Sequence, residues 1–252
     1  MTLANRENQA VPDVEFRLRE DGEWTSVRSA ELFRDKTVVV FALPGAFTPT
    51  CSSSHVPRYQ QLAPTFHAHG VDDIVCLSVN DAFVMDAWRK EEGADRIRFI
   101  PDGNGEFTTA MGMMVDKGDL GFGARSWRYS MLVRDGVIEK MFIEPEVEGD
   151  PYGASDADTM LRYVAEDARV PPSIVLFTKP GCSFCVKAKR RLQDRGLEYE
   201  EIVSTQSMRL AVSGLGTTPQ VFVDGKHLGG ADELDAWFTR GDDTNAAHSD
   251  AA

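Results

Sequence analysis

Residues 37–51 read TVVVFALPGAFTPTC, and they give the clearest indication of the fold of the first half of the chain. Its first seven residues form a continuous apolar run, rich in β-branched side chains, that stops at Pro44. Such a run is typical of a strand that is buried on both faces of a sheet. A helical pattern then extends from Cys51 to Thr65. Cys51 is therefore expected in the first turn of a helix that follows a buried strand.

The rest of the first half alternates between strand and helix patterns. The patterns predict strands at 74–79, 99–101, 128–133 and 137–143, and helices at 82–91 and 156–165. Asp135-Gly136, between the last two strands, is a strong hairpin signal. Strands that alternate with helices and end in a hairpin predict an α/β sandwich.

A polar segment that ends in Pro171-Pro172 interrupts this pattern, and a smaller set of elements follows it. These are strands at 174–177, 198–203, 220–223 and 226–228, with helices at 182–196 (closed by Gly196), 207–213 and 232–238. We therefore expect domains at residues 1–168 and 174–241, a linker at 169–173, and a disordered tail at 242–252.

Composition narrows the classes of function. The formal net charge of -13 disfavours a nucleic-acid-binding surface. The sequence has no apolar stretch long enough for a membrane span and no signal-peptide pattern at its start, so we expect a cytoplasmic protein that does not bind membranes. Four cysteines are too few for a disulfide-stapled secreted scaffold. Each cysteine is therefore a candidate reagent, metal ligand or core residue.

Cys51 is the first candidate reagent. Unpaired backbone N–H groups and the helix dipole favour an anion in the first turn of a helix, and the thiolate is the nucleophilic form of cysteine. A nearby guanidinium would favour the thiolate further, and Arg128 is the candidate. Thr48 lies close enough for its hydroxyl to bond a peroxide, and Pro44 can shield the sulfur from water. The alternative for a lone cysteine at this position is core packing.

The motif Pro44-x-x-x-Thr48-x-x-Cys51 resembles the signature of the peroxiredoxins, and its surroundings resemble their type-five (atypical) subfamily. The resemblance covers most of residues 10–165, including Val11-Pro12-Asp13, 46–51, 77–83, Arg128-Tyr129-Ser130-Met131 and Asp135-Gly136. It implies that Cys51 attacks a hydroperoxide and becomes a sulfenic acid. It also implies that Pro44, Thr48 and Arg128 form the pocket that stabilises O–O cleavage. Arg125 is the less favoured guanidinium, because Arg128 directly precedes the Tyr-Ser-Met run.

One departure from this subfamily concerns the resolving cysteine. Some members carry a resolving cysteine shortly after the position of Glu144-Pro145, and Glu144 to Thr159 contains none here. Cys76 lies inside a predicted buried strand and is expected to pack in the core. The sulfenic acid on Cys51 must therefore be captured by a group from outside the first domain.

Cys182 and Cys185 form a C-x-x-C motif that again follows a buried strand and opens a helix. This placement predicts that Cys182 is the exposed attacking thiol and Cys185 its recessed partner. Lys179, Lys187 and Lys189 are expected to add positive charge around the motif. One alternative is half of a zinc site, which the lack of a second C-x-x-C disfavours. The other is a subunit-bridging iron–sulfur cluster.

Residues 174–240 resemble glutaredoxins. The resemblance rests on the C-x-x-C motif, on residues 216–222 (GTTPQVF) and on Gly229-Gly230-Ala231-Asp232. Without the resemblance, Thr218-Pro219 would be a simple turn and the glycine pair a helix N-cap. Ser183 stands where many glutaredoxins have proline.

The glutaredoxin resemblance implies a binding site for glutathione. It implies a cis bond before Pro219 that presents the backbone of Thr218 to the cysteine of glutathione. Lys179 would bind the glycine carboxylate, and Gly230, Ala231 and Asp232 would hold the γ-glutamyl end. Gln206 and Arg209 are further candidate contacts.

Together the resemblances imply two thioredoxin-fold domains, each a three-layer α/β/α sandwich, in a glutathione-dependent thiol peroxidase. Its substrates would be hydrogen peroxide and alkyl hydroperoxides. Glutathione would condense with the sulfenic acid of Cys51, Cys182 would remove the glutathionyl group, and a second glutathione would free Cys182. Cys185 is optional in this scheme. Glutathione is a co-substrate, and neither a metal nor a tightly bound cofactor is expected.

The short, stiff linker predicts that Cys182 reacts with Cys51 of another subunit, in a homodimer or homotetramer.

Three other functions remain open. The first is a peroxide-sensing thiol switch, the second a binding or holdase protein with vestigial thiols. The third is a general protein deglutathionylase whose first domain only docks its targets.

Overall fold

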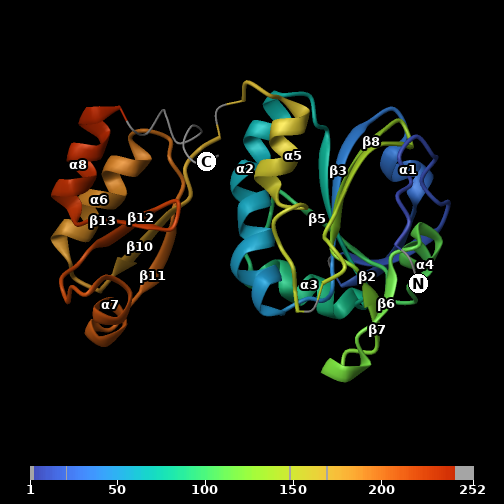
Figure 1. Cartoon of the computed structure of the whole chain (residues 1–252), viewed down its shortest axis with the longest axis horizontal. Helices are drawn as coiled ribbons and strands as arrows, with labels where there is room; N and C mark the ends of the chain where they lie inside the picture. The colour runs from blue at the N-terminus through green and yellow to red at the C-terminus, as the bar shows by residue number, and fades with distance from the viewer. Residues whose placement is uncertain (1–2, 21, 148, 169, 242–252) are drawn as a thin grey trace. The chain divides into compact units, whose positions relative to one another are not determined.

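The computed structural model describes residues 3–20, 22–147, 149–168 and 170–241 (Figure 1). The chain divides into two compact units, Met1–Ala168 and Arg169–Ala252. Arg169 in the predicted linker and the predicted tail 242–252 lie outside the described residues. Over the described ranges, no helix combines the length and the hydropathy that crossing a membrane requires.

A five-stranded mixed sheet forms the centre of the first unit. In sheet order its strands are β5 (Arg98–Pro101), β4 (Asp73–Ser78), β3 (Thr37–Leu43), β8 (Tyr129–Arg134) and β9 (Val137–Ile143). The strands β3, β4 and β5 are parallel, whereas β8 and β9 are antiparallel to their neighbours. β3 lies in the middle, which accounts for its unbroken apolar sequence.

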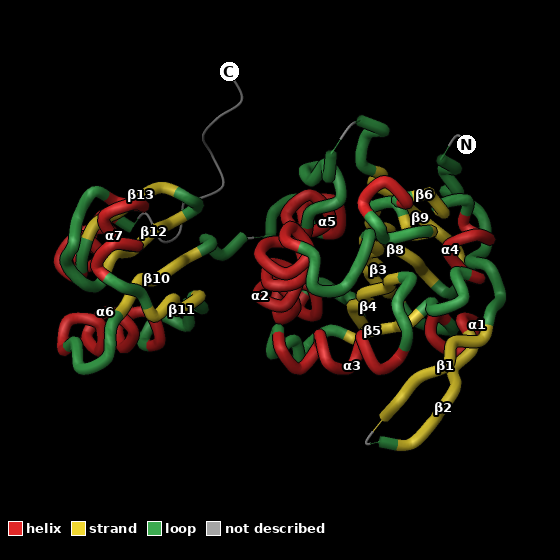
Figure 2. The backbone as a smooth tube through the Cα atoms, turned by 90° about the horizontal axis from the view of Figure 1, so that it is seen from below, coloured by secondary structure: helices red, strands yellow, loops and turns green. Residues whose placement is uncertain are grey.

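Helices cover both faces of this sheet. They are α1 (Ser29–Phe33), α2 (Val56–Ala68), α3 (Ala82–Glu91), α4 (Glu106–Met111) and α5 (Ala157–Val164). α2 and α5 lie on one side of the sheet, and α1 and α4 lie on the other (Figures 1 and 2). Successive side chains of β3 point to opposite faces of the sheet. Val38 and Val40 join the core with α1 and α4, while the Phe41 ring stacks on Tyr59 of α2 at 4.2 Å.

Several short elements are absent from the sequence prediction. They are α1, α4, the hairpin β1 (Glu15–Glu20) and β2 (Glu23–Arg28), the pair β6 (Met114–Asp116) and β7 (Ala124–Ser126), and a 3₁₀ turn at Gly118–Leu120. Side chains of β2 are mostly exposed, so the strand lacks the apolar alternation by which strands are recognised. β1 does alternate apolar Phe16 and Leu18 with charged residues, a strand signal that the prediction did not use. The remaining elements are only three to six residues long.

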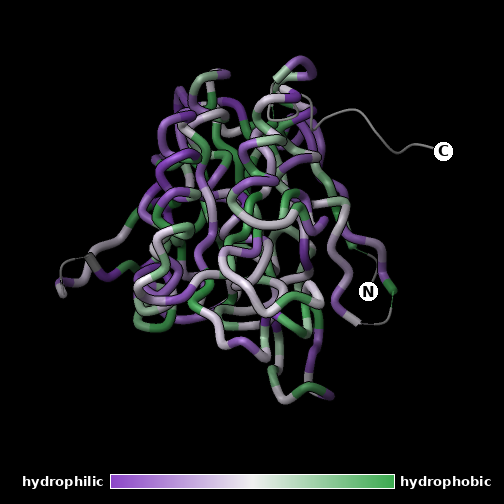
Figure 3. The backbone as a smooth tube through the Cα atoms, turned by 90° about the vertical axis from the view of Figure 1, so that its left-hand side faces the viewer, coloured by the Kyte–Doolittle hydropathy of each residue, from purple (hydrophilic) through white to green (hydrophobic). Residues whose placement is uncertain are grey.

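The second unit repeats the plan at smaller size. Its elements are β10 (Ile174–Thr178), α6 (Ser183–Gln193), β11 (Glu200–Val203), α7 (Gln206–Ser213), β12 (Gln220–Val223), β13 (Lys226–Gly229) and α8 (Ala231–Arg240). The sheet order is β11-β10-β12-β13. Leu176 and Val221 pack in one core with Leu192 of α6 and Leu234 of α8. Hydrophobic and hydrophilic stretches alternate along the backbone, as buried strands joined by exposed loops require (Figure 3).

The largest boundary error in this unit is at the end of a helix. The helix predicted at 182–196 ends at Gln193, and Asp194 rather than Gly196 is its C-cap. The chain then leaves the helix through tighter bonds, such as Gly196 N–H to the carbonyl of Gln193 at 3.0 Å. Gly196 has φ +66° and makes the turn beyond the helix, where its conformation is accessible to glycine.

Candidate active site

Cys51 opens a π-helical turn, η1 (Cys51–His55), that leads into α2. The backbone N–H of Val56 donates to the carbonyl of Cys51, which closes the wide turn. Turns of this kind are rare and occur often at functional sites. Cys51 and His55 are both buried.

Arg128 contacts the sulfur of Cys51. Its side chain is 1% exposed, and Nη1 donates to Cys51 Sγ at 3.4 Å and contacts Nδ1 of His55 at 3.0 Å. Nη2 donates to both carboxylate oxygens of Asp150 at 2.6 Å. Burial lowers the pKa of Arg128, but Cys51 and Asp150 outweigh it, and the net pKa is raised. The guanidinium therefore stays a cation beside the sulfur.

The loop between β3 and Cys51 is fixed by polar contacts. Thr48 Oγ1 donates to the carbonyl of Gly45 at 2.8 Å, and the N–H of Ala46 donates to Oδ1 of Asn80 at 3.0 Å. Pro44 is buried at the end of β3. Pro44 and Thr48 therefore lie in a loop whose backbone is held in place just before Cys51.

Arg125 has a different partner. Its Nη1 donates to the carbonyl of Val79 at 2.9 Å. In the described part of the chain, Arg128 is the arginine with a hydrogen bond to Cys51.

Both cysteines of the first unit are covered. Cys51 is 0% exposed, so a peroxide can reach its sulfur only after neighbouring groups move. Cys76 in β4 is equally buried, and burial raises the pKa of its thiol well above the ordinary value. Cys76 therefore remains a protonated thiol within the core.

Three polar side chains of this site were not predicted from the sequence: His55 and Asp150, which contact Arg128, and Glu144, which holds the loop after Asp150. His55 had a usable signal, because it lies four residues after Cys51 and so shares its helix face. Asp150 comes from a loop without a pattern. Oε1 of Glu144 accepts bonds from the N–H groups of Gly153, Ala154 and Ser155 at 2.9, 2.9 and 2.7 Å, and so anchors this loop.

Cys182 and Cys185 are joined by a disulfide. Cys182 is the N-cap of α6, where its sulfur accepts a bond from the N–H of Cys185 at 3.1 Å. The sequence predicted an exposed Cys182, but it is 8% exposed and Cys185 is 2% exposed. In this state both are buried, because the loop that ends at Pro219 lies against the disulfide.

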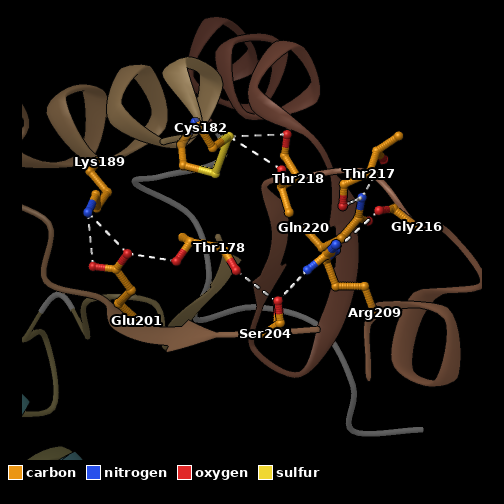
Figure 4. The surroundings of a disulfide bond; sticks show 11 residues. Thr178, Cys182, Lys189, Glu201, Ser204, Arg209, Gly216, Thr217, Thr218 and Gln220 are labelled. Atoms are coloured by element: carbon orange, nitrogen blue, oxygen red, sulfur yellow. Dashed lines mark hydrogen bonds and ion pairs between the residues drawn. A yellow bond between two sulfur atoms is a disulfide. The ribbon is translucent and has the colours of Figure 1, made fainter. Parts of the chain in front are cut away.

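This loop carries the cis bond between Thr218 and Pro219 that the glutaredoxin resemblance implies. Thr218 Oγ1 donates to Cys182 Sγ at 3.4 Å, and the Thr218 carbonyl oxygen lies 3.7 Å from the same sulfur (Figure 4). The buried Arg209 of α7 supports the loop by donating from Nε to the carbonyl of Gly216 at 3.2 Å.

The three lysines near the disulfide differ in whether a carboxylate pairs with them. The pKa of Lys187 is raised by its bonds to Asp235 and Asp232. Lys189 donates to both carboxylate oxygens of Glu201 at 3.0 Å. The sequence predicted that these two lysines add positive charge around the motif, but carboxylates from other elements neutralise them. Lys179 is exposed and has no ion pair with any residue that the structure describes.

Gly230, Ala231 and Asp232 lie where α8 begins. The N–H of Gly230 donates to Oε2 of Glu233 at 2.8 Å. A Cβ at position 230 would lie 3.7 Å from the carbonyl oxygen of Pro219, so this helix start adjoins the loop at Cys182. Over the described ranges, no group of three or more His, Cys, Asp or Glu is arranged to hold a metal ion.

Comparison with known proteins places each unit. A family model described as Redoxin matches residues 6–161, and one described as Glutaredoxin matches residues 174–228. The hybrid peroxiredoxin hyPrx5 of Haemophilus influenzae is 59% identical over 240 residues, which cover 94% of this chain and all of that protein. Peroxiredoxin sll1621 of Synechocystis is 57% identical over 62% of this chain and 89% of its own length.

A solved structure is similar to the first unit. It is reduced Prx3 from Vibrio vulnificus in complex with hydrogen peroxide, with a TM-score of 0.61 and 38% sequence identity. The match covers 64% of this chain and 99% of that one.

Proposed function

Because this chain belongs to the peroxiredoxins and carries a C-terminal glutaredoxin domain, we propose that it is a glutathione-dependent thiol peroxidase. Cys51 reduces hydrogen peroxide or an alkyl hydroperoxide, and Cys182 returns Cys51 to its thiolate. The observation that carries the proposal is the 3.4 Å bond from Arg128 Nη1 to the sulfur of Cys51. It supports both a thiolate at this position and a donor for the oxygen on which charge develops.

The first step is a displacement at oxygen. The Cys51 thiolate attacks one peroxide oxygen, an S–O bond forms, and the O–O bond breaks. The leaving oxygen takes up a proton to become water or an alcohol, and Cys51 becomes a sulfenic acid. The guanidinium of Arg128 is the donor that we assign to this transition state. The hydroxyl of Thr48, whose hydrogen is bonded to the carbonyl of Gly45, accepts from the peroxide, and Pro44 excludes water.

The second step resets the sulfur. Glutathione displaces the sulfenic oxygen as water and leaves a mixed disulfide on Cys51. The Cys182 thiolate attacks the glutathione sulfur and releases the Cys51 thiolate, and a second glutathione removes the glutathionyl group from Cys182. The net reaction converts one hydroperoxide and two glutathione into an alcohol, water and glutathione disulfide. The N–H of Cys185, 3.1 Å from the Cys182 sulfur, favours a thiolate there.

The glutathione site that we propose surrounds Cys182. Thr218 and Pro219 supply the backbone that pairs with the cysteine of glutathione. Lys179 binds the glycine carboxylate. At the start of α8, the γ-glutamyl carboxylate accepts from the backbone N–H of Ala231 and displaces Oε2 of Glu233 from the N–H of Gly230, while the Asp232 carboxylate suits its ammonium group.

Peroxide consumption with glutathione as the sole reductant tests the proposal. We expect many catalytic cycles per protein chain, with the oxidised product appearing as glutathione disulfide at one mole per mole of peroxide. A protein that consumes only one peroxide per chain under these conditions would instead be a peroxide-sensing thiol switch. That second candidate is favoured by the complete burial of Cys51, which slows access.

We also propose that the two thiols meet between subunits of a homo-oligomer. Five residues, 169–173, separate the proposed domains, which supports transfer to a neighbouring chain rather than within one. Equal amounts of Cys51→Ser and Cys182→Ser proteins should complement each other after subunit exchange. In a dimer, half of the particles are then mixed and each has one working pair, so activity returns to about a quarter of the parental value.

The control for this experiment is each variant alone, which should stay inactive at the same total concentration. Exchange is verified by native mass spectrometry with subunits of different isotope content. An inactive mixture in which mixed particles are present would refute transfer between subunits, as would a fully active monomer.

A further inference from the structure

His55 has no role in the chemistry proposed above, yet it lies beside the reacting sulfur. It is fully buried at the end of η1, and its ring lies 4.8 Å from that of Phe41 and 5.0 Å from that of Tyr152, between centroids. Two polar contacts hold the ring. Nδ1 lies 3.0 Å from Nη1 of Arg128, and Nε2 lies 3.3 Å from the carbonyl oxygen of Ser155.

These two contacts determine the tautomer. A guanidinium only donates hydrogen bonds, so Nδ1 of His55 accepts from Arg128 and carries no proton. The proton therefore resides on Nε2, which donates to the carbonyl of Ser155. Burial, reinforced by the Arg128 cation, lowers the pKa of His55 to about 3. The imidazole is thus neutral at every pH at which the enzyme would work.

The other titratable groups around the ring do not alter this state. They come from three elements: Cys51 from η1, Tyr59 from α2, and Tyr152 from the loop after β9, while Asp150 contacts the ring's partner Arg128 rather than the ring. Burial raises the pKa of both tyrosines, so they are neutral phenols. Arg128 is the cation that faces the imidazole, and the same nitrogen, Nη1, bonds the sulfur of Cys51.

The number of N–H hydrogens on the Arg128 guanidinium explains why an acceptor at His55 is needed to hold it in place. Nη1 carries two hydrogens, of which one is directed at the Cys51 sulfur and the other at His55. Nη2 is occupied by the carboxylate of Asp150, and Nε has no hydrogen-bond partner among the residues that the structure describes. Without an acceptor at Nδ1, one hydrogen of Nη1 would be unsatisfied in a buried site, and the guanidinium would turn to satisfy it.

We propose that His55, as a neutral imidazole protonated on Nε2, is a positioning residue that holds Nη1 of Arg128 on the sulfur of Cys51. The inference rests on the proposed role of Cys51 as the peroxide-reducing thiol. His55 itself touches neither peroxide nor glutathione. It acts by fixing the direction of the donor that stabilises the thiolate and the breaking O–O bond.

Paired substitutions test the role. His55→Leu keeps much of the volume and removes the acceptor, whereas in His55→Asn the amide oxygen replaces Nδ1. We expect the second-order rate constant of Cys51 with hydrogen peroxide to fall about tenfold or more in His55→Leu and to stay within about threefold of the parent in His55→Asn. Equal losses in both variants, or none in His55→Leu, would overturn the proposal.

The reaction can be followed in a single turnover by tryptophan fluorescence. Trp88 Nε1 donates to Oγ of Ser52, the neighbour of Cys51, at 2.8 Å, so the indole reports on this turn. His67→Leu is the matched control. His67 is exposed in α2 and bonds the carbonyl of Val71 at 2.8 Å, and its replacement should leave the rate at the parental value.

A measurement on the parent protein does not depend on how the variants fold. The ¹⁵N chemical shifts of the His55 ring should report the neutral Nε2–H tautomer from about pH 5 to pH 8, without a titration step. An Nδ1–H tautomer or a titration in that range would overturn the inference. Because no peroxide is involved, this result is separate from a failure of the proposed peroxidase, which would appear as full activity in Cys51→Ser.

Discussion

Replacing Cys51 by serine is expected to abolish glutathione-supported peroxide consumption, with turnover lower by a factor of about a thousand or more. A serine hydroxyl stays protonated near neutral pH even beside Arg128, so the nucleophile is lost while the pocket keeps its shape. The measurement is the initial rate of peroxide loss at fixed enzyme and glutathione concentrations.

Cys76→Ala is the matched control, because Cys76 is the other buried cysteine of the same unit. Burial in β4 raises the pKa of its thiol, so it supplies no thiolate to the reaction. Its replacement should leave turnover within about twofold of the parent, although removal of a buried sulfur costs about 1–2 kcal/mol of stability. A Cys51→Ser protein with more than a tenth of the parental turnover would refute the assignment of Cys51.

Replacing Cys182 by serine is expected to separate the two halves of the cycle. Steady-state turnover with glutathione should fall by about a hundredfold or more, because the mixed disulfide on Cys51 then waits for slow exchange with free glutathione. The first reaction of Cys51 with peroxide should keep its parental rate constant. Stopped-flow measurement of one turnover, beside the steady-state rate of the same sample, gives both numbers.

Cys185→Ser is the control for this variant. Cys185 is the more buried sulfur of the disulfide, and the transfer of a glutathionyl group requires Cys182 alone. We expect Cys185→Ser to keep turnover within about threefold of the parent. Equal losses in the two variants would point to a dithiol route, and unchanged turnover in Cys182→Ser would mean that the second domain does not reset Cys51.

Sequence patterns were sufficient where one element is buried along its whole length or is strongly periodic. β3 spans the predicted residues 37–43 and α3 the predicted residues 82–91. The patterns failed for β2, whose exposed side chains carry no signal of pairing with β1. They also failed for the end of α6, because the tight exit from that helix depends on local bonds around Gly196 that composition does not reveal.

The residues of the candidate site likewise divide into those that the sequence predicted and those that it did not. Cys51, Thr48 and Pro44 lie within one motif, and Arg128 is marked by the strand that it precedes. Asp150 was missed because its contact with Arg128 joins a patternless loop to a strand 22 residues earlier in the chain.

The charge around Cys182 was mispredicted for a related reason. Local sequence shows the lysines of α6 but not the acidic side chains that face them from other elements. Asp232 and Asp235 of α8 pair with Lys187, and Glu201 of β11 pairs with Lys189. Long-range ion pairs of this kind are set by how the elements pack, which one sequence does not specify.

The role of Cys51 is tested by mass spectrometry of the Cys182→Ser protein, treated with one equivalent of hydrogen peroxide and then with glutathione. We expect one glutathione per chain, and a peptide map that places it on Cys51. A protein that stays unmodified, or that carries the glutathione on another cysteine, would contradict the claim that Cys51 passes through a mixed disulfide which Cys182 resolves.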